Sequence, residues 1–201
     1  MLFPFSLDEK VASGLVRSDF YFLKEGFIMQ KLTFVPLDTE KDAHIQEFER
    51  LMRLYCRELD EHDGTTTLQS FLTRWIDSII RLQAQAETDR HLELCFLDDE
   101  PVGFLYGKVD HPHHRGFIKP SYGYIMEFFV LPAHRRQGIG RTMYERLERL
   151  FEQDGVQRMY LTADPVTGLP FWEAMGFKRT GEVSPENSQE ILEKDVKSIC
   201  R

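Results

Sequence analysis

The stretch from residue 127 to residue 141 reads EFFVLPAHRRQGIGR and is the most informative part of this chain. An apolar run meets Pro132, then a basic turn with two glycines, and then the start of an amphipathic helix. Gly138 and Gly140 carry no side chain, so consecutive backbone N–H groups of the turn can converge on one point. The following helix adds its unpaired first-turn donors and the positive end of its dipole. This pattern predicts a phosphate or diphosphate site directly after a strand.

Two common nucleotide-binding motifs do not fit this turn. The GxxxxGK[ST] pattern requires a lysine that the turn lacks. The GxGxxG fingerprint requires a third glycine where Met143 stands, and it opens a βαβ unit rather than lying past mid-chain. Arg135, Arg136 and Arg141 surround the turn with positive charge. On the residues alone, a helix start with solvated arginines remains the alternative.

Outside this turn, the spacing of apolar residues predicts alternating strands and helices. The expected strands are residues 31–37, 91–97, 102–109, 122–131, 157–162, a strand from 177, and 189–196. The expected helices are residues 43–58, 71–82, 139–154 and 170–175. The four residues 98–101 read as a hairpin turn. This order predicts the α/β class, with one mixed sheet and helices on its faces.

Length and composition limit the classes of function. The chain has 201 residues, 42% of them hydrophobic, which suits one domain with a packed core. Its net charge of −8 argues against a nucleic-acid-binding protein, which usually carries a basic surface. No apolar stretch approaches the roughly 20 residues that span a bilayer, and the first ten residues lack the basic start of a secretory signal. We therefore expect a cytoplasmic protein with no membrane or nucleic-acid partner.

Cysteine and histidine positions give no sign of a metal or disulfide framework. Cys56, Cys95 and Cys200 lie far apart, are odd in number and form no CxxC pair. His111, His113 and His114 share a loop, but no carboxylate or cysteine partner follows at a recognisable ligand spacing. We expect reduced thiols, no metal, and a surface loop at these histidines.

The segment before the first expected strand has aromatic residues but no sustained period. We treat residues 1–28 as an N-terminal extension to a domain at residues 29–201. Met29 directly precedes the strand, so one hypothesis makes Met29 the natural start. The alternative is a helical arm packed on the domain.

Two separated motifs resemble those of the GNAT superfamily of acetyl-CoA-dependent N-acetyltransferases. Arg135-x-x-Gly138-x-Gly140 matches the family's phosphate-loop pattern [RQ]xxGx[GA]. The stretch FWEAMGF at residues 171–177 is similar to the family's later FYExxGF-like stretch. The order of elements from about residue 30 to residue 196 also matches. The resemblance implies a GNAT-like fold, with a central, mostly antiparallel sheet of about six or seven strands and helices on both faces.

The resemblance also implies acetyl-CoA as co-substrate. In the family, the strand before the phosphate loop pairs with the pantetheine arm, a role that falls here to Phe128, Phe129 and Val130. The N–H group near Phe128 would polarise the thioester carbonyl and hold the oxyanion. Arg135 opens the motif, and backbone N–H groups of the loop would hold the diphosphate. The residues concerned are Arg136, Gln137, Gly138, Ile139, Gly140 and Arg141.

The chain departs from the family pattern at two positions. Many members have a tyrosine at the second position of the later motif, where it acts as general acid for the departing thiolate. Trp172 stands there in this chain, and its indole is no acid at working pH. Asp164-Pro165 occupies the neighbourhood in which members often carry an asparagine.

The candidate catalytic residue is Glu127, the only carboxylate in the apolar run 125–131. It lies beside the thioester site that the resemblance implies and can act as general base for the amine, directly or through water. The alternative is a carboxylate that fixes neighbouring backbone or an arginine. Tyr124 and Tyr160 are either proton relays or packing residues.

The acceptor side is less defined by the sequence. The acidic connection 58–63 would attract a cationic amine, or it is simply a solvated loop. Phe171 and Trp172 either wall the CoA or acceptor pocket or pack in the core. A sheet edge near residues 189–196 could support a homodimer.

We therefore expect an N-acetyltransferase that moves an acetyl group from acetyl-CoA to a primary amine of a small molecule or peptide by direct attack. The alternative is an acyl-CoA-binding sensor or interaction module without turnover. A plain α/β scaffold without CoA affinity is the third reading.

Overall fold

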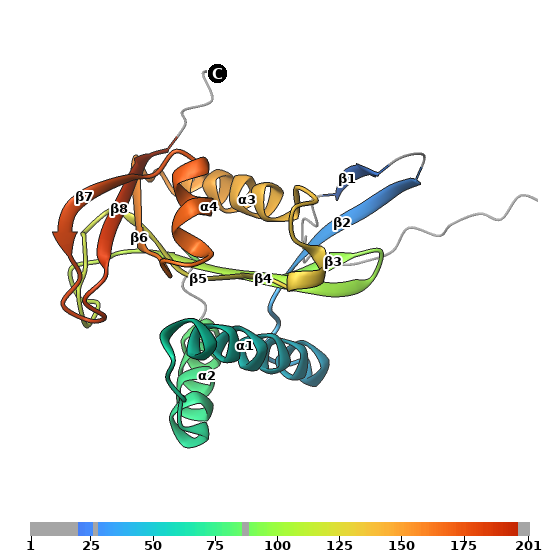
Figure 1. Ribbon diagram of the computed structural model, residues 1–201, viewed down its shortest axis with the longest axis horizontal. Coiled ribbons are helices and arrows are strands. Elements are labelled where there is room, and N and C mark those ends of the chain that lie inside the picture. Colours follow the sequence, from blue (N-terminus) through green and yellow to red (C-terminus); the bar gives the residue numbers. More distant parts are fainter. Residues whose placement is uncertain (1–19, 26–27, 86–88, 197–201) are drawn as a thin grey trace, which may run out of the picture.

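The computed structural model describes residues 20–25, 28–85 and 89–196, and within them a sheet of eight strands lies between two layers of helices (Figure 1). The strands are β1 (Phe20–Glu25), β2 (Ile28–Pro36), β3 (Arg90–Leu97), β4 (Glu100–Val109), β5 (Gly123–Val130), β6 (Arg158–Thr162), β7 (Lys178–Val183) and β8 (Glu190–Asp195). The helices are α1 (Asp42–Asp63), α2 (Gln69–Gln83), the 3-10 turn η1 (Pro132–His134), α3 (Ile139–Gln153) and α4 (Gly168–Ala174). Every strand and helix expected from the sequence is present.

The strand order across the sheet is β1-β2-β3-β4-β5-β6-β8-β7. All neighbouring strands are antiparallel except β5 and β6, which are parallel. This confirms the predicted mixed, mostly antiparallel sheet. The eighth strand is β1, which comes from the segment we expected to be an extension and pairs with β2 from Phe20–Thr33 to Glu25–Ile28. Residues 1–19 of that extension lie outside the described residues.

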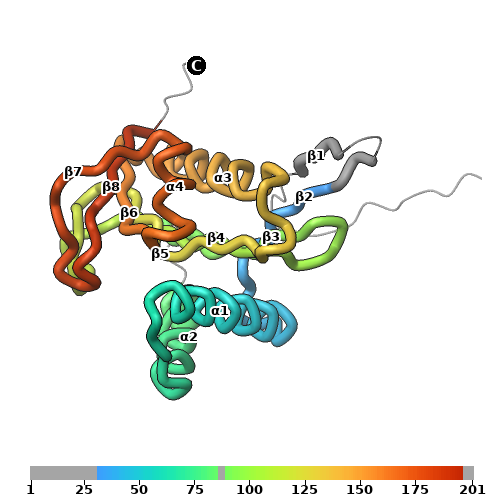
Figure 2. Tube along the Cα trace, viewed as in Figure 1, coloured from blue at the N-terminus to red at the C-terminus, as the bar shows by residue number. Residues whose placement is uncertain are grey.

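Helices cover both faces of the sheet, as predicted. α1 and α2 lie on one face, and α3 and α4 lie on the other (Figures 1 and 2). Each face has its own apolar cluster: Phe48 and Ile76 belong to the α1/α2 face, and Leu147 and Phe151 to the α3 face. The sheet is therefore buried on both sides over its central strands, which explains their continuous apolar runs.

Among the boundaries that differ from the sequence-based prediction, two have a clear physical reason. α1 continues to Asp63 rather than ending near residue 58, and Gly64 ends it with φ +65°. The last turn of α1 consists of polar residues, so the spacing of apolar residues gave no sign that the helix continues there. The hairpin turn between β3 and β4 has two residues, not four, because Asp98 and Asp99 adopt φ +48° and +70° and Leu97 pairs with Glu100. Two successive left-handed residues are the geometry of a tight hairpin turn.

The expected sheet edge at residues 189–196 is wrong. β8 pairs with β6 on one side and β7 on the other, so it lies inside the sheet. The strand at this end of the sheet is β7, and it is exposed along its length. The reason is the antiparallel hairpin of β7 and β8, which inserts the later strand between β6 and the earlier one.

No described helix has the length and apolar character to cross a membrane.

A buried ion pair joins β3 to α3. Arg146 donates from Nε and Nη2 to the carboxylate of Glu93 at 2.9 and 2.7 Å, and both side chains are buried. We expect Glu93→Ala to lower the free energy of unfolding by about 3–5 kcal/mol, because it removes one partner of a buried pair. Glu47→Ala, which breaks an exposed pair with Arg50 on α1, should cost less than about 1 kcal/mol. Urea unfolding of both variants tests this, and equal losses would contradict it.

Candidate active site

The turn between β5 and α3 has the conformation expected of an anion site. Arg136 and Gly138 adopt φ +66° and +88°, and α3 begins with Gly138 as its N-cap. The Gly138 carbonyl accepts a hydrogen bond from the Thr142 N–H at 3.0 Å, in the first turn of α3. In the part of the chain that the structure describes, no backbone carbonyl accepts a hydrogen bond from the N–H groups of residues 136–141. These donors and the helix dipole favour an anion at this turn. We call residues 135–141 the phosphate loop.

The three arginines of the phosphate loop differ in their environments. Arg136 and Arg141 are exposed. Arg135 is half-buried, and its guanidinium donates to Glu58 from Nη1 and Nη2 at 2.8 and 2.6 Å. Its Nε donates to the Val130 carbonyl at 2.8 Å. The side chain of Arg135 is thus bound to protein groups, whereas those of Arg136 and Arg141 face solvent.

A cavity of about 660 Å³ begins at the phosphate loop and lies between β5 and β6. The two strands pair at Gly123–Met159 and Tyr124–Tyr160, and residues from the rest of both strands line the cavity. The lining residues fall into four groups. From β5 and the phosphate loop they include Phe128, Phe129, Val130, Arg135, Arg136, Gly138, Gly140 and Arg141; from α1, Tyr55 and Glu58; from β6 and its loop, Thr162 and Asp164; from α4, Phe171 and Trp172.

A β-bulge decides which way Glu127 faces. Tyr106 pairs with Glu127 and Gly107 with Ile125, so the residue between them on β5 is extra. Ile125 and Phe128 both pack in the α3-face cluster, although regular alternation would put them on opposite faces. Glu127 is thereby turned from the α3 face toward α1, where it hydrogen bonds with Tyr55.

The environment of Glu127 makes its carboxyl group a weaker acid than that of an ordinary glutamate. Burial raises the pKa of Glu127 to about 8, and the hydrogen bond with Tyr55 offsets part of this rise. Burial raises the pKa of Tyr55, and the negative charge of Glu127 raises it further. A carboxylate whose pKa lies near neutral pH is suited to proton transfer in either direction.

Trp172 lies in an aromatic cluster that walls the cavity. Its ring centroid is 5.1 Å from Phe128, 4.8 Å from Phe171, 5.3 Å from Phe177 and 6.0 Å from Tyr144. It is 5% exposed. Trp172 thus both lines the cavity and packs in the core.

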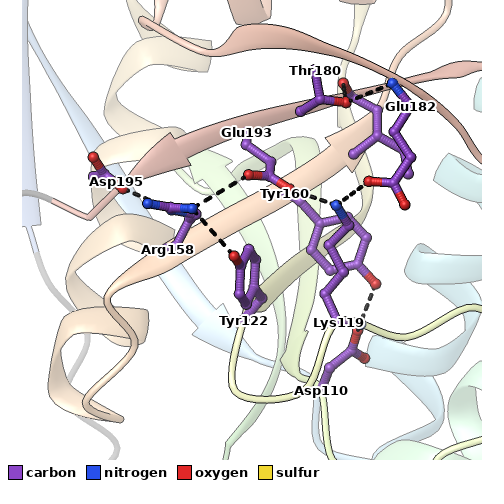
Figure 3. Close-up of polar contacts among 10 residues, drawn as sticks. Asp110, Lys119, Tyr122, Arg158, Tyr160, Thr180, Glu182, Glu193 and Asp195 are labelled. Atoms are coloured by element: carbon purple, nitrogen blue, oxygen red, sulfur yellow. Dashed lines mark hydrogen bonds and ion pairs between the residues drawn. The ribbon is translucent and has the colours of Figure 1, made fainter.

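Tyr160 is held in a polar network at the β7–β8 end of the sheet. Its hydroxyl donates to the buried Asp110 at 2.5 Å (Figure 3). Its ring stacks on that of Tyr124, with the centroids 4.5 Å apart. Lys119 of the same loop donates to Glu182 and Glu193 at 2.5 and 2.6 Å. The burial and fixed hydroxyl of Tyr160 fit the packing alternative rather than a proton relay.

The three histidines of the loop after β4 pack against one another, and the two described cysteines are free. His111, His113 and His114 pack ring against ring, with centroids 4.8–5.5 Å apart. Across residues 20–25, 28–85 and 89–196, no three His, Cys, Asp or Glu side chains gather as a metal site. Cys56 and Cys95 are free and buried; Cys200 lies outside the described residues.

Sequence reasoning missed the residues that α1 brings to the site. Tyr55 contacts Glu127, and Glu58 contacts Arg135, yet Tyr55 read as one apolar position of an amphipathic helix and Glu58 as part of an acidic connection. No local signal could have found these pairs, because their partners are more than 70 residues away in sequence.

Comparison with solved structures finds the same fold. The PaiA N-acetyltransferase of Thermoplasma acidophilum, solved in complex with coenzyme A, is 17% identical, with a TM-score of 0.63 over 82% of this chain and 98% of that chain. An acetyltransferase of Thermus thermophilus is 19% identical, with a TM-score of 0.60 over 82% and 96%. An aminoglycoside 6′-acetyltransferase type Ii is 16% identical, with a TM-score of 0.59 over 83% and 99%.

No curated protein sequence matches the chain. The model of the acetyltransferase (GNAT) family matches residues 48–177, which is more than half of the chain. That range includes most of α1, the bulged strand β5, the phosphate loop and α4. The chain therefore belongs to the acetyltransferase (GNAT) family, and this membership supports acyl transfer as its general activity.

Proposed function

We propose that this protein is an N-acetyltransferase that moves an acetyl group from acetyl-CoA to a primary amine of a small molecule or peptide. The observation that carries the proposal is the cavity between β5 and β6, which has the phosphate loop at its border and opens toward α1, the helix that contacts Glu127. Anion donors and an open strand edge thus adjoin one space, and the half-buried Glu127 lies between two of its lining residues, Met126 and Phe128, without lining it itself. Each suits a different part of an acyl transfer from CoA to an amine.

The phosphate loop suits the diphosphate of CoA. Its N–H groups from residue 136 to residue 141 have no carbonyl partner among the described residues, and Arg136 and Arg141 add positive charge in solvent. Within the described ranges, the edge of β5 that faces β6 has no paired strand beyond Tyr124, so Phe128, Phe129 and Val130 can pair with the amide groups of the pantetheine arm. We assign these residues to co-substrate binding.

Two groups of β5 are suited to the chemical step. The N–H of Phe128 would stabilise the oxyanion that forms when the amine attacks the thioester, an interaction often worth several kcal/mol. Glu127 would take a proton from the ammonium form of the acceptor, directly or through one water, which leaves the free amine to attack the thioester. Its position after the bulge puts it on the α1 face, away from the α3-face cluster that contains Phe128.

Direct attack, rather than transfer through an acyl-cysteine, fits the state of the thiols. Burial raises the pKa of Cys56 to about 12 and also raises that of Cys95. A thiol acts as a nucleophile only as the thiolate, so neither group is activated. Neither cysteine lines the cavity. The free state of both thiols also fits the expected cytoplasmic location.

The leaving thiolate of CoA does not require an acid at position 172. A thiol pKa is about 8.5, so water can protonate it after the carbon–sulfur bond breaks. We expect Trp172→Phe to change kcat by less than about threefold, because phenylalanine keeps the aromatic packing and the indole supplies no proton. Steady-state kinetics at saturating acetyl-CoA measure this. A loss of more than about a hundredfold in a folded variant would give the indole N–H a catalytic role.

The second candidate is an acyl-CoA sensor without turnover, which the tryptophan in place of the family's tyrosine favours. Free-thiol release from acetyl-CoA across a panel of small-molecule and peptide amines, with calorimetric titration of CoA, separates the two. Release with at least one amine supports the enzyme. Binding of CoA without thiol release for every amine supports the sensor. If the protein neither binds CoA nor releases thiol, both candidate functions are wrong.

A further inference from the structure

The C-terminal half of α1 is joined by an ion pair and a hydrogen bond to the two loops that border the cavity. The Glu58 carboxylate accepts two hydrogen bonds from Arg135, at 2.8 Å from Nη1 and 2.6 Å from Nη2. His62, one helical turn later, lies with Nδ1 3.1 Å from Oδ1 of Asp164. Arg135 belongs to the phosphate loop after β5, and Asp164 to the loop after β6. One helix therefore contacts both walls of the cavity.

Sheet pairing alone does not hold these two walls together. β5 and β6 share the registered pairs Gly123–Met159 and Tyr124–Tyr160, at the start of β5, and the cavity lies beyond them. An open gap between two strands has no backbone hydrogen bonds to fix its width. The contacts of α1 cross this gap at the end where the pairing is missing.

Further hydrogen bonds fix the geometry of both pairs. Arg135 also donates from Nε to the Val130 carbonyl, and its guanidinium carbon lies 5.6 Å from the centroid of the Phe129 ring. Asp164 Oδ2 accepts from the N–H and Oγ1 of Thr167 at 2.7 and 2.9 Å. The Oγ1 of Thr167 is also 3.5 Å from Glu58, so the two pairs adjoin. Side-chain exposure is 28% for Arg135 and 16% for Glu58, which limits screening by water and salt.

The phosphate loop needs such support to keep its shape. Arg136 is a non-glycine residue with φ +66°, a region that disfavours residues with a side chain. α3 anchors one end of the loop through the buried Ile139, and the pair with Glu58 anchors the other end at Arg135. Three of the six N–H groups that would hold the diphosphate, those of residues 136–138, lie between these two anchors.

We propose that the pairs Glu58–Arg135 and His62–Asp164 are positioning pairs, through which α1 sets the width of the cavity and holds the phosphate loop in its binding conformation. The inference rests on the proposed function, because the ligand it concerns is CoA. It gives Arg135 a role that does not require its side chain to reach a phosphate. It also makes α1, which lines the cavity with Tyr55 and Glu58, part of the co-substrate site.

A double-mutant cycle on CoA affinity tests the first pair. Glu58→Gln and Arg135→Met should each raise the calorimetric Kd for CoA by about tenfold, equivalent to about 1.4 kcal/mol. The double variant should bind no more weakly than either single variant, since all three lack the same interaction. Arg136→Ala should instead add its effect to that of Arg135→Met. Arg50→Gln, which breaks the exposed Glu47–Arg50 pair on the same helix, is the matched control and should leave the Kd unchanged.

Kinetics and melting separate positioning from a general loss of structure. KM for acetyl-CoA should rise with the Kd, and kcat at saturation should stay within about twofold, because neither side chain reaches the acyl group. His62→Ala should repeat this pattern at the second pair. A merely structural role would lower the melting temperature without ligand and leave the Kd unchanged well below it.

The outcomes are distinct from those of the proposed function. Wild-type protein without CoA affinity would overturn both the function and the pairs. Wild-type affinity retained in folded Glu58→Gln and Arg135→Met would overturn the pairs alone. If Arg135→Met fails to fold, the nearly isosteric Glu58→Gln decides the matter by itself.

Discussion

Replacing Glu127 with glutamine is expected to lower kcat by about 10²–10³-fold, within the range that a well-placed base contributes. Glutamine keeps the size of the side chain and its contact with Tyr55 but cannot accept the proton that the acceptor ammonium loses to become the attacking amine. Because Glu127 does not belong to the phosphate loop, the Kd for CoA should stay within about twofold of the wild-type value. Steady-state kinetics and calorimetry on the same preparation measure both quantities.

The pH dependence gives an independent test of the same residue. The base must be ionised, and burial raises the pKa of Glu127 to about 8. In wild-type protein kcat/KM should therefore rise with pH and level off above about pH 8, and this limb should disappear in Glu127→Gln. Tyr55→Phe removes a hydrogen bond that favours the ionised form, so it should move the limb to higher pH.

Folding stability should respond to the same titration. The folded-state pKa of Glu127 is raised above its unfolded value, so its stabilising contribution is complete below the unfolded pKa of about 4.5 and is lost as pH rises through about 8. The melting temperature of wild-type protein should thus fall relative to that of Glu127→Gln between about pH 5 and pH 9. Glu100→Gln, at an exposed strand carboxylate, is the matched control and should show neither effect. Wild-type rates in Glu127→Gln would remove the residue from the mechanism.

Replacing Gly138 with aspartate is expected to weaken CoA binding by at least about a hundredfold. The residue has φ +88°, where a side chain strains the backbone, and the new carboxylate would repel the diphosphate at the loop. Gly140→Asp should act similarly, since a Cβ there would lie 3.2 Å from the Phe171 ring that lines the cavity. Calorimetric titration with CoA gives the Kd of each variant.

Gly155 offers a matched control at the other end of α3. It has φ +79°, and a Cβ there would meet nothing within 4 Å. Gly155→Asp introduces the same residue and a similar backbone strain, so it should lower stability about as much as Gly138→Asp does. It should leave CoA affinity within about twofold, because its carboxylate is a helix length away from the loop. Equal loss of affinity in both variants would contradict the assignment of the phosphate loop.

Most of the fold could be predicted because its signals are local. The apolar stripes of α1 and α3 and the apolar runs of the later strands repeat with the periods of a helix and a strand, so those elements were found, whereas β1 in the aperiodic N-terminal segment was not. The misses came where no period exists. The polar last turn of α1 and the two-residue turn at Asp98 and Asp99 depend on caps and backbone angles rather than on hydrophobic spacing.

The sequence by itself determined the phosphate loop. Its glycines, its basic residues and the start of α3 are consecutive, so the chemistry of the neighbouring residues 127–141 is enough to predict a turn with unpaired N–H donors. The tertiary structure decided where the other groups of the site point. The bulge of β5 turns Glu127 toward α1, and the packing of α1 on the sheet brings Tyr55 to Glu127 and Glu58 to Arg135. Such contacts join residues far apart in the chain, and they depend on strand register and helix docking, which no local pattern encodes.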